Sequence, residues 1–199
     1  MIKTFATALG LMAMEASAAP RLRRCPRDYS PMESLDLDRY LGTWYEIHRD
    51  KFTPFEILLG CDIAEYTAND DGTITVKNSG HRPIQGWSSV EGSAVLADTG
   101  DASLIVSFSG NTPSPSDEAN YTVLDTDYET YSIVYSCGNI FGLASFDFLW
   151  ILAREPQLDD QKMLELIGKI EDKLPDYGFF KNSIETRQGK TCPYSKRPE

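Results

Sequence analysis

Short segments in which hydrophobic and polar residues alternate follow one another between residues 43 and 153. Alternation with a period of two is typical of a strand with one buried face. Turn residues separate the segments, and Asn69-Asp70-Asp71-Gly72 is the strongest hairpin signal. The pattern predicts eight strands, near residues 43–48, 61–67, 73–79, 87–97, 104–108, 121–124, 131–137 and 146–153.

Eight consecutive strands with short connections predict an all-β fold, an eight-stranded antiparallel up-and-down β-barrel. Closing the sheet removes its exposed edges. At this strand number the interior can hold one small ligand.

One segment after the strands has helical periodicity. Met163, Ile167, Ile170 and Leu174 recur at helical spacing before Pro175. Asp159 or Asp160 can cap the helix. We expect this C-terminal α-helix to pack outside the barrel, and a single helical turn at residues 36–40.

The N-terminus resembles a secretory signal peptide of residues 1–18. Lys3 precedes a short apolar run, and Ala16-Ser17-Ala18 fits the cleavage site. The run is too short to cross a membrane, and the alternative is an unstructured leader. We expect a secreted, extracellular protein with one domain over residues 19–199.

Charge and cysteines narrow the function further. The net charge of −11 argues against nucleic acid as a partner. The four cysteines fit an oxidising compartment, and their wide spacing without a CxxC pair argues against a metal site. Spacing alone allows three disulfide pairings among Cys25, Cys61, Cys137 and Cys192.

Three motifs, in this order and spacing, resemble the signature regions of the lipocalins: Leu41-Gly42-Thr43-Trp44-Tyr45-Glu46, Thr126-Asp127-Tyr128 and Phe148-Leu149-Trp150-Ile151-Leu152-Ala153-Arg154. Val134-Tyr135-Ser136-Cys137 and the cysteine layout add a similarity to the apolipoprotein D-like group. That group includes insect bilin-binding and crustacean carotenoid-binding lipocalins. The resemblance covers roughly residues 25–194.

The resemblance implies a plug at the closed end of the barrel. Trp44, which follows Gly42, would fill this end, and Arg154 would lie across it. Arg154 shares strand parity with Trp150 and is expected to point inward, where an indole face offers a cation–π contact. The resemblance also implies the disulfides Cys25–Cys137 and Cys61–Cys192.

The resemblance further implies a pocket for a steroid, fatty acid, bilin or carotenoid. By position, Trp150 would be a pocket wall and Asn78 a polar group that hydrogen-bonds ligand. Alternation agrees, because Asn78 shares a face with Val76, and Trp150 shares one with Phe148 and Leu152. The alternative for the aromatic residues is plain core filling. Further inward candidates are Phe108, Tyr121, Tyr135 and Tyr66.

Three surface features complete the picture. Glu46 and His48 share parity with Trp44 and are expected near the mouth, most simply exposed to solvent. The apolar loop 52–60, and a second one at 140–143, predict either a lid or a contact with lipid surfaces. Asn120 begins a glycosylation sequon.

The leading hypothesis is a secreted carrier of a small hydrophobic ligand, which requires no cofactor and can hold a bilin or carotenoid chromophore. A lipid-converting enzyme is the first alternative. We expect no enzyme, because the implied disulfides use every cysteine and no Ser/His/Asp set is visible. A protein-interaction module or pigment-complex subunit is the second alternative, and the oligomeric state is open.

Overall fold

A computed structural model describes residues 25–26, 29–51, 53, 56, 58–140 and 144–198. The predicted signal peptide, four residues of the loop 52–60 and residues 141–143 lie outside this description.

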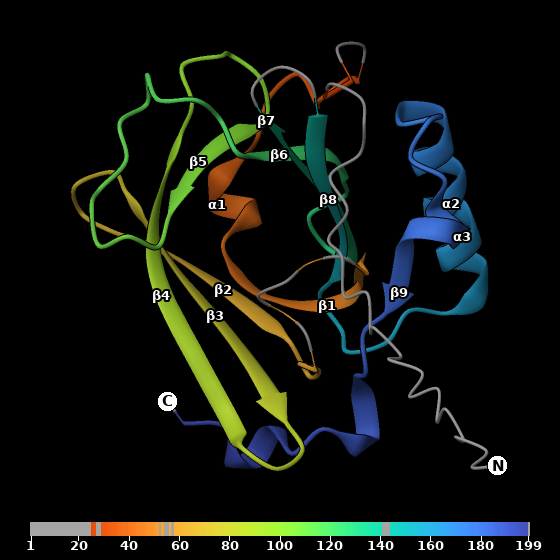
Figure 1. Cartoon of the computed structure of the whole chain (residues 1–199). Helices are drawn as coiled ribbons and strands as arrows, with labels where there is room; N and C mark the ends of the chain where they lie inside the picture. Colours follow the sequence, from red (N-terminus) through yellow and green to blue (C-terminus); the bar gives the residue numbers. More distant parts are fainter. Residues whose placement is uncertain are drawn as a thin grey trace, which may run out of the picture.

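Eight antiparallel strands close into a barrel, as predicted (Figure 1). Each strand from β2 to β8 pairs with the next, and β1 pairs with both β2 and β8. The strands are β1 (Gly42–Asp50), β2 (Ile63–Ala68), β3 (Ile74–Arg82), β4 (Gly86–Leu96), β5 (Ser103–Ser107), β6 (Tyr121–Thr126), β7 (Tyr131–Ile140) and β8 (Ala144–Ala153).

The two expected helices are present. The turn α1 (Leu37–Tyr40) is capped by Asp36, and α2 (Asp160–Lys173) is capped by Asp159, which accepts a hydrogen bond from the Lys162 amide. Helix α2 packs outside the barrel, on the right in Figure 1. Within the described residues, no helix has the length and apolar character that a membrane crossing requires.

The C-terminal segment contains short elements that the sequence pattern did not predict. They are α3 (Phe179–Asn182), β9 (Ser183–Glu185) and the 3₁₀ turns η2 (Gly189–Thr191) and η3 (Tyr194–Lys196). Strand β9 pairs with residues 48–50 of β1, beyond the part of β1 that pairs with β2. Three residues are too few for a periodic signal, so this strand depends on the free edge of β1.

The barrel wall separates two cores. On its outer face, Ile133 and Ile151 pack against Leu166 and Ile170 of α2. On its inner face, a second core surrounds Trp44 at the closed end of the barrel. Neighbouring residues of one strand therefore belong to different cores, as strand alternation requires.

Both implied disulfides are present. Cys25 pairs with Cys137 and ties the N-terminal segment to β7, with the two Cα atoms 5.8 Å apart. Cys61 pairs with Cys192 and ties the C-terminal tail to the residues before β2, with the two Cα atoms 5.6 Å apart. These distances lie in the normal range for a disulfide.

A β-bulge in β1 changes which side chains face the interior. The register between β1 and β8 shifts between Glu46 and His48, so that Arg49 lies opposite Trp150. The ring of His48 instead packs against Phe179 on the outer side. The expectation that His48 faces the mouth is therefore wrong, because simple alternation does not hold across a bulge.

Candidate functional site

The closed end of the barrel is sealed by the Trp44 side chain, which is fully buried. The guanidinium carbon of Arg154 lies 3.6 Å from the centre of the Trp44 ring, and the indole N–H donates to the Tyr40 carbonyl at 2.8 Å. The N–H groups of Arg154 donate to the carbonyls of Tyr128, Thr43, Arg39 and Tyr40 at 3.0, 2.9, 2.7 and 3.4 Å. This charge is held by backbone dipoles and by the indole face, as a structural plug requires.

Gly42 precedes this plug and has a backbone requirement of its own. Its φ is +94°, a region that L side chains rarely adopt. A Cβ added there would lie 3.5 Å from Nη1 of Arg154, an ordinary contact. The glycine is therefore required by conformation and not by space.

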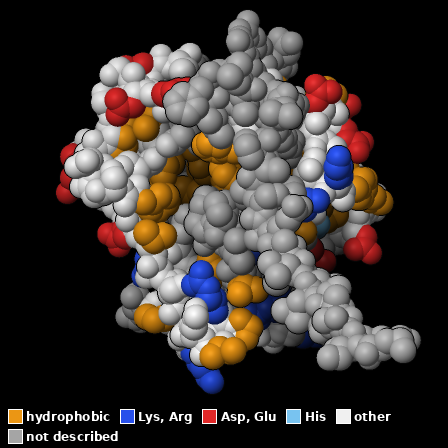
Figure 2. All heavy atoms as spheres, in the orientation of Figure 1, with side chains coloured by type: hydrophobic (Ala, Val, Ile, Leu, Met, Phe, Trp, Pro, Cys, Tyr) orange, Lys and Arg blue, Asp and Glu red, His pale blue; other side chains and the backbone are white. Residues whose placement is uncertain are grey.

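An aromatic wall follows the inner face of β8 toward the open end. The rings of Phe146 and Phe148 have centroids 5.7 Å apart, and those of Phe148 and Trp150 lie 5.8 Å apart. Phe146 is 44% exposed, whereas Leu152, next to the closed end, is buried. Figure 2 shows a hollow on this face of the molecule with hydrophobic side chains along its wall.

The inner faces of β3 to β5 form another wall. Val76 is buried and Asn78 is half-buried, and the Oδ1 atom of Asn78 is buried without a hydrogen-bond partner among the described residues. Phe108 follows β5, is 43% exposed, and its ring lies over Gly92. A side chain at position 92 would occupy the space of this ring.

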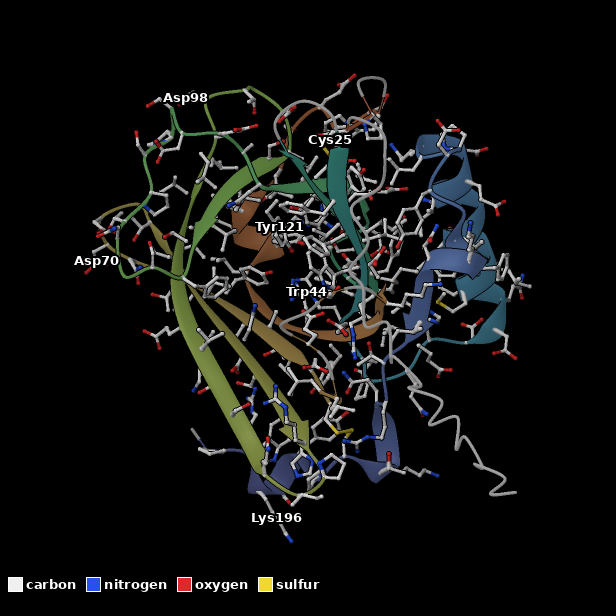
Figure 3. The ribbon with its side chains drawn as sticks, viewed as in Figure 1. Cys25, Trp44, Asp70, Asp98, Tyr121 and Lys196 are labelled. Atoms are coloured by element: carbon white, nitrogen blue, oxygen red, sulfur yellow. A yellow bond between two sulfur atoms is a disulfide. The ribbon has the colours of Figure 1, made fainter. Side chains whose placement is uncertain are left out.

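Three tyrosines add hydroxyl groups above the plug. The Tyr40 and Tyr121 hydroxyls lie 2.8 Å apart, and the Tyr66 hydroxyl donates to that of Tyr121 at 2.9 Å. Burial raises the pKa of Tyr40 to about 12, and it also raises the pKa values of Tyr66 and Tyr121. Figure 3 shows Tyr121 and Trp44 within the ring of strands.

Tyr135 lies on the other side of the wall. It is opposite Leu149 in the β7–β8 pairing, belongs to the core under α2, and packs edge-on against Tyr29 with the ring centroids 5.3 Å apart. Its hydroxyl donates to Asp147 at 3.0 Å. The expectation that Tyr135 lines the interior is therefore wrong, because its neighbour Val134 takes the inward position on β7.

A buried charged cluster lies beside Trp150. An Arg49 nitrogen is 3.0 Å from a carboxylate oxygen of Glu46, and Glu56 and Asp62 each lie 3.8 Å from Arg49. Glu46 is 5% exposed, so the expectation that it is exposed at the mouth is wrong. The sequence pattern did not identify this cluster, because only the bulge brings Arg49 inward.

Three carboxyl groups surround Arg49 in this cluster, and Arg187 and Arg82 act on Asp62 as well. Burial raises the pKa of Glu46. Burial, together with the nearby carboxylates, raises the pKa of Glu56 well above its ordinary value and that of Asp62 to about 8. The raised pKa values follow from the burial of these carboxyl groups and from their mutual repulsion.

The same cluster anchors the first loop to the wall. The Trp150 indole N–H donates to the Glu56 carboxylate at 3.3 Å, and Arg49 donates to the Glu56 carbonyl at 3.0 Å. Thr186, which follows β9, donates to the Glu46 carboxylate. Hydrogen bonds around Arg49 therefore connect the first loop, through Glu56, with the aromatic wall and with Thr186 of the C-terminal tail.

The remaining predicted groups are placed as follows. Asn120 is exposed, and its amide side chain pairs with the backbone N–H and carbonyl of Val106 at 2.8 and 2.9 Å. All four cysteines are in disulfides. Among the residues that the structure describes, no group of three or more His, Cys, Asp or Glu side chains is arranged to hold a metal ion.

Sequence comparison places the chain among known proteins. The family model for the lipocalin-like domain matches residues 35–188. Mouse (Mus musculus) apolipoprotein D is 34% identical over 197 residues, which cover 97% of each chain. Apolipoprotein D of Macaca fascicularis is 37% identical over 92% of each chain, and the outer membrane lipoprotein Blc of Escherichia coli K12 is 35% identical over 82% of this chain and 84% of its own.

Solved structures agree on the fold. Insecticyanin from the tobacco hornworm Manduca sexta superposes with a TM-score of 0.70 at 23% identity, over 85% of this chain and 88% of its own. Lobster apocrustacyanin A1 superposes with a TM-score of 0.64 at 21% identity, over 87% and 98%. The family match, together with 34% identity to mouse apolipoprotein D over nearly the full length of both chains, shows that the chain belongs to the lipocalin family, in its apolipoprotein D-like group.

Proposed function

We propose that this protein is a secreted, non-enzymatic carrier that holds one small hydrophobic molecule inside the barrel. The observation that carries the proposal is the aromatic wall of Phe146, Phe148 and Trp150, which runs from the exposed rim toward the sealed end. A concave apolar wall with few polar groups is what small-ligand sites require. Ligand burial there gains free energy with the apolar area removed from water.

Specific residues would contact the ligand. Asn78 supplies the polar contact, since its buried Oδ1 lacks a partner among the described residues and an amide so placed gains from a ligand hydrogen bond. The other residues that we propose as ligand contacts are Trp150, Phe148, Phe108, Val76, Leu152, Tyr66 and Tyr121.

The row of tilted aromatic rings on β8 supports a ligand with an extended π-system. Aromatic side chains contact such a system by offset-stacked or edge-to-face packing, which a bilin or a carotenoid permits and a saturated fatty acid does not. We therefore rank a chromophore above a saturated lipid.

The carrier proposal extends to the form of the mature protein. A leader of residues 1–18 followed by one domain over residues 19–199 fits two disulfides formed in an oxidising compartment. Because both disulfides use all the cysteines, the thiol nucleophile of a lipid-converting enzyme is missing. Asn120 is exposed and is proposed as a glycan site, which a mobility shift on enzymatic deglycosylation would test.

Contact of the loop 52–60 with lipid surfaces is a further part of the proposal. Leu58 in this loop is 78% exposed, as an apolar docking side chain would be. Liposome flotation of the intact protein tests it, and absence of the protein from the lipid fraction would remove this part of the proposal only.

The test of the carrier begins with native mass spectrometry and an absorption spectrum of protein from its natural source. A bound mass with a visible band identifies a pigment carrier, whereas a colourless bound lipid identifies a lipid carrier. Ligand-free protein is then titrated with biliverdin, a carotenoid, a fatty acid and a sterol. No binding of any of these would overturn the proposal.

A matched pair of variants locates the site. Phe148→Arg should weaken binding by at least about tenfold, because it removes an aromatic ring from the contact surface and places a long polar side chain in its space. Phe180→Arg is the control, since Phe180 is 76% exposed on the helical side of the molecule, and it should leave binding unchanged. Equal effects of the two changes would mean that the ligand does not contact this wall.

A further inference from the structure

Four hydroxyl groups form one chain at the inner end of the barrel. The Tyr66 hydroxyl donates to Tyr121 at 2.9 Å, the Tyr121 and Tyr40 hydroxyls lie 2.8 Å apart, and the Tyr40 and Ser132 hydroxyls lie 3.0 Å apart. The chain therefore runs from Tyr66 through Tyr121 and Tyr40 to Ser132. It is a polar patch next to the otherwise apolar core around Trp44.

The number of hydrogens in this chain exceeds the number of links. Four hydroxyls carry four hydrogens, and three hydrogen bonds use three of them. One hydroxyl hydrogen therefore needs an acceptor outside the chain. Since Tyr66 donates to Tyr121, the remaining hydrogen belongs to Tyr121, Tyr40 or Ser132, according to the direction of the two other bonds.

Burial decides among these three positions. Tyr40 and Ser132 are 1% and 0% exposed, and an O–H without an acceptor is costly at either place. Tyr121 is the member of the chain that is not fully buried, and it lies on the inner face opposite Leu104. The favourable arrangement has Ser132 donating to Tyr40, and both Tyr40 and Tyr66 donating to Tyr121. The hydrogen of Tyr121 is then the one that lacks an acceptor within the chain.

We propose that the hydroxyl of Tyr121 binds a carbonyl oxygen at the leading end of the hydrophobic ligand. The proposal rests on the carrier function, and it specifies the chemical group of the ligand that the inner end of the barrel recognises. A carbonyl oxygen of a ligand in the barrel would accept the one hydrogen for which the chain of hydroxyls has no acceptor of its own. The two hydrogen bonds that Tyr121 accepts polarise its O–H and make it a stronger donor.

An uncharged carbonyl fits this floor better than a carboxylate. A carboxylate buried there would need several donors or a cation, and the chain offers one hydrogen. Arg154 is the nearby cation that acts on Tyr40, but its N–H groups are engaged by backbone carbonyls on the other side of the plug. We therefore expect a ketone, ester or similar group at the inner end.

The test compares two probes of nearly the same shape, decan-2-one and 2-methyldec-1-ene, in which a methylene group replaces the carbonyl oxygen. Dissociation constants are measured by tryptophan fluorescence for the intact protein, for Tyr121→Phe and for Tyr45→Phe. Tyr45 packs outside the barrel against Tyr194 and is the matched control. We expect Tyr121→Phe to weaken binding of the ketone about tenfold, the net effect of one hydrogen bond, and to leave binding of the alkene within twofold.

An infrared measurement reports the contact directly. In the complex with the unmodified protein, the carbonyl stretch of ¹³C-labelled decan-2-one should lie at lower frequency than in an alkane solvent, and this shift should be lost in the complex with Tyr121→Phe. An unshifted stretch, or equal losses of both probes in Tyr121→Phe, would overturn the role of Tyr121 and leave the carrier function standing. Failure of the unmodified protein to bind either probe would count against both.

Discussion

Arg154 and Trp44 close the barrel as a unit, with the guanidinium carbon 3.6 Å from the centre of the indole ring. The cation is in contact with an aromatic face and with backbone carbonyls from three separate segments of the chain. The plug therefore joins the start of β1, the turn after β6 and the end of β8. Its loss should affect the whole barrel.

Arg154→Lys should lower the free energy of unfolding by about 2–3 kcal/mol, although the charge is kept. A lysine ammonium cannot stack as a plane on the indole, and it cannot reach carbonyls on several sides. Urea denaturation followed by tryptophan fluorescence measures the change.

Arg39→Lys is the control for this substitution. Arg39 also lies over an aromatic ring, that of Tyr128, at 4.4 Å, but its side chain is 49% exposed. A loss of about 0.5 kcal/mol or less is expected there, since exposed pairs contribute little. Equal losses for the two changes would show that Arg154 is not a plug.

Asp62→Asn should stabilise the protein increasingly as the pH rises from about 4 to 8. Burial raises the pKa of the folded Asp62 to about 8, whereas the unfolded chain releases this proton near pH 4. The free energy of unfolding of the unmodified protein therefore falls over this interval. That of the variant does not, because an amide side chain does not titrate. We expect a gain of about 1–3 kcal/mol at pH 8 and little change at pH 4.

Thermal or urea unfolding across this pH range checks the prediction, with Asp98→Asn at an exposed turn as the control. A stability difference that stays flat with pH would show that Asp62 is ionised throughout.

Gly92→Ala should be more destabilising than Gly138→Ala. A Cβ at position 92 would collide with the backbone carbonyl of Ser107, which pairing between strands holds in place. A Cβ at position 138 would lie 2.9 Å from the ring of Phe146, which is exposed and can rotate away. We expect the free energy of unfolding to fall by about 2 kcal/mol in Gly92→Ala and by less than about 1 kcal/mol in Gly138→Ala, measured by chemical denaturation. The reverse order would contradict the packing described for these strands.

The tyrosines at the barrel floor should resist ionisation. Burial raises the pKa of Tyr40 to about 12 and also raises the pKa values of Tyr66 and Tyr121, so all three should stay neutral near pH 11 in the folded protein. In the unfolded chain they ionise near pH 10, so stability should fall as the pH rises above 10. Ultraviolet titration of the folded and the denatured protein should differ by at least these three tyrosines at pH 11, and identical curves would place these hydroxyls in water.

The sequence predicted those parts of the molecule that depend on local periodicity and on the family motifs. Alternation located all eight barrel strands within a few residues, and spacing located α2 and its cap at Asp159. The bulge was not predictable, because one extra residue in β1 has no sequence signature of its own. This residue moved His48 to the outer face and brought Arg49 inward.

Two other features required the tertiary structure. The face on which Tyr135 lies follows from the pairing of β7 with β8, and an aromatic residue fits either face equally well. Strand β9 forms because β1 continues beyond its pairing with β2 and leaves an edge. Neither a pairing partner nor an unfilled edge is a property of the local sequence.

The pairing of β9 with β1 and the bond from Cys61 to Cys192 also set an order of events during synthesis. The segment that completes the β1 edge is made after all eight barrel strands, so a growing chain can assemble its hairpins before it can finish this seam. Contacts between the two ends of a chain form slowly, since a long loop must close first. An incomplete chain would meanwhile present the open edge of β1 to its neighbours, the kind of edge on which proteins aggregate. Truncation before Ser183, which removes β9 and Cys192, should therefore reduce the yield of soluble protein well before it alters the ligand cavity.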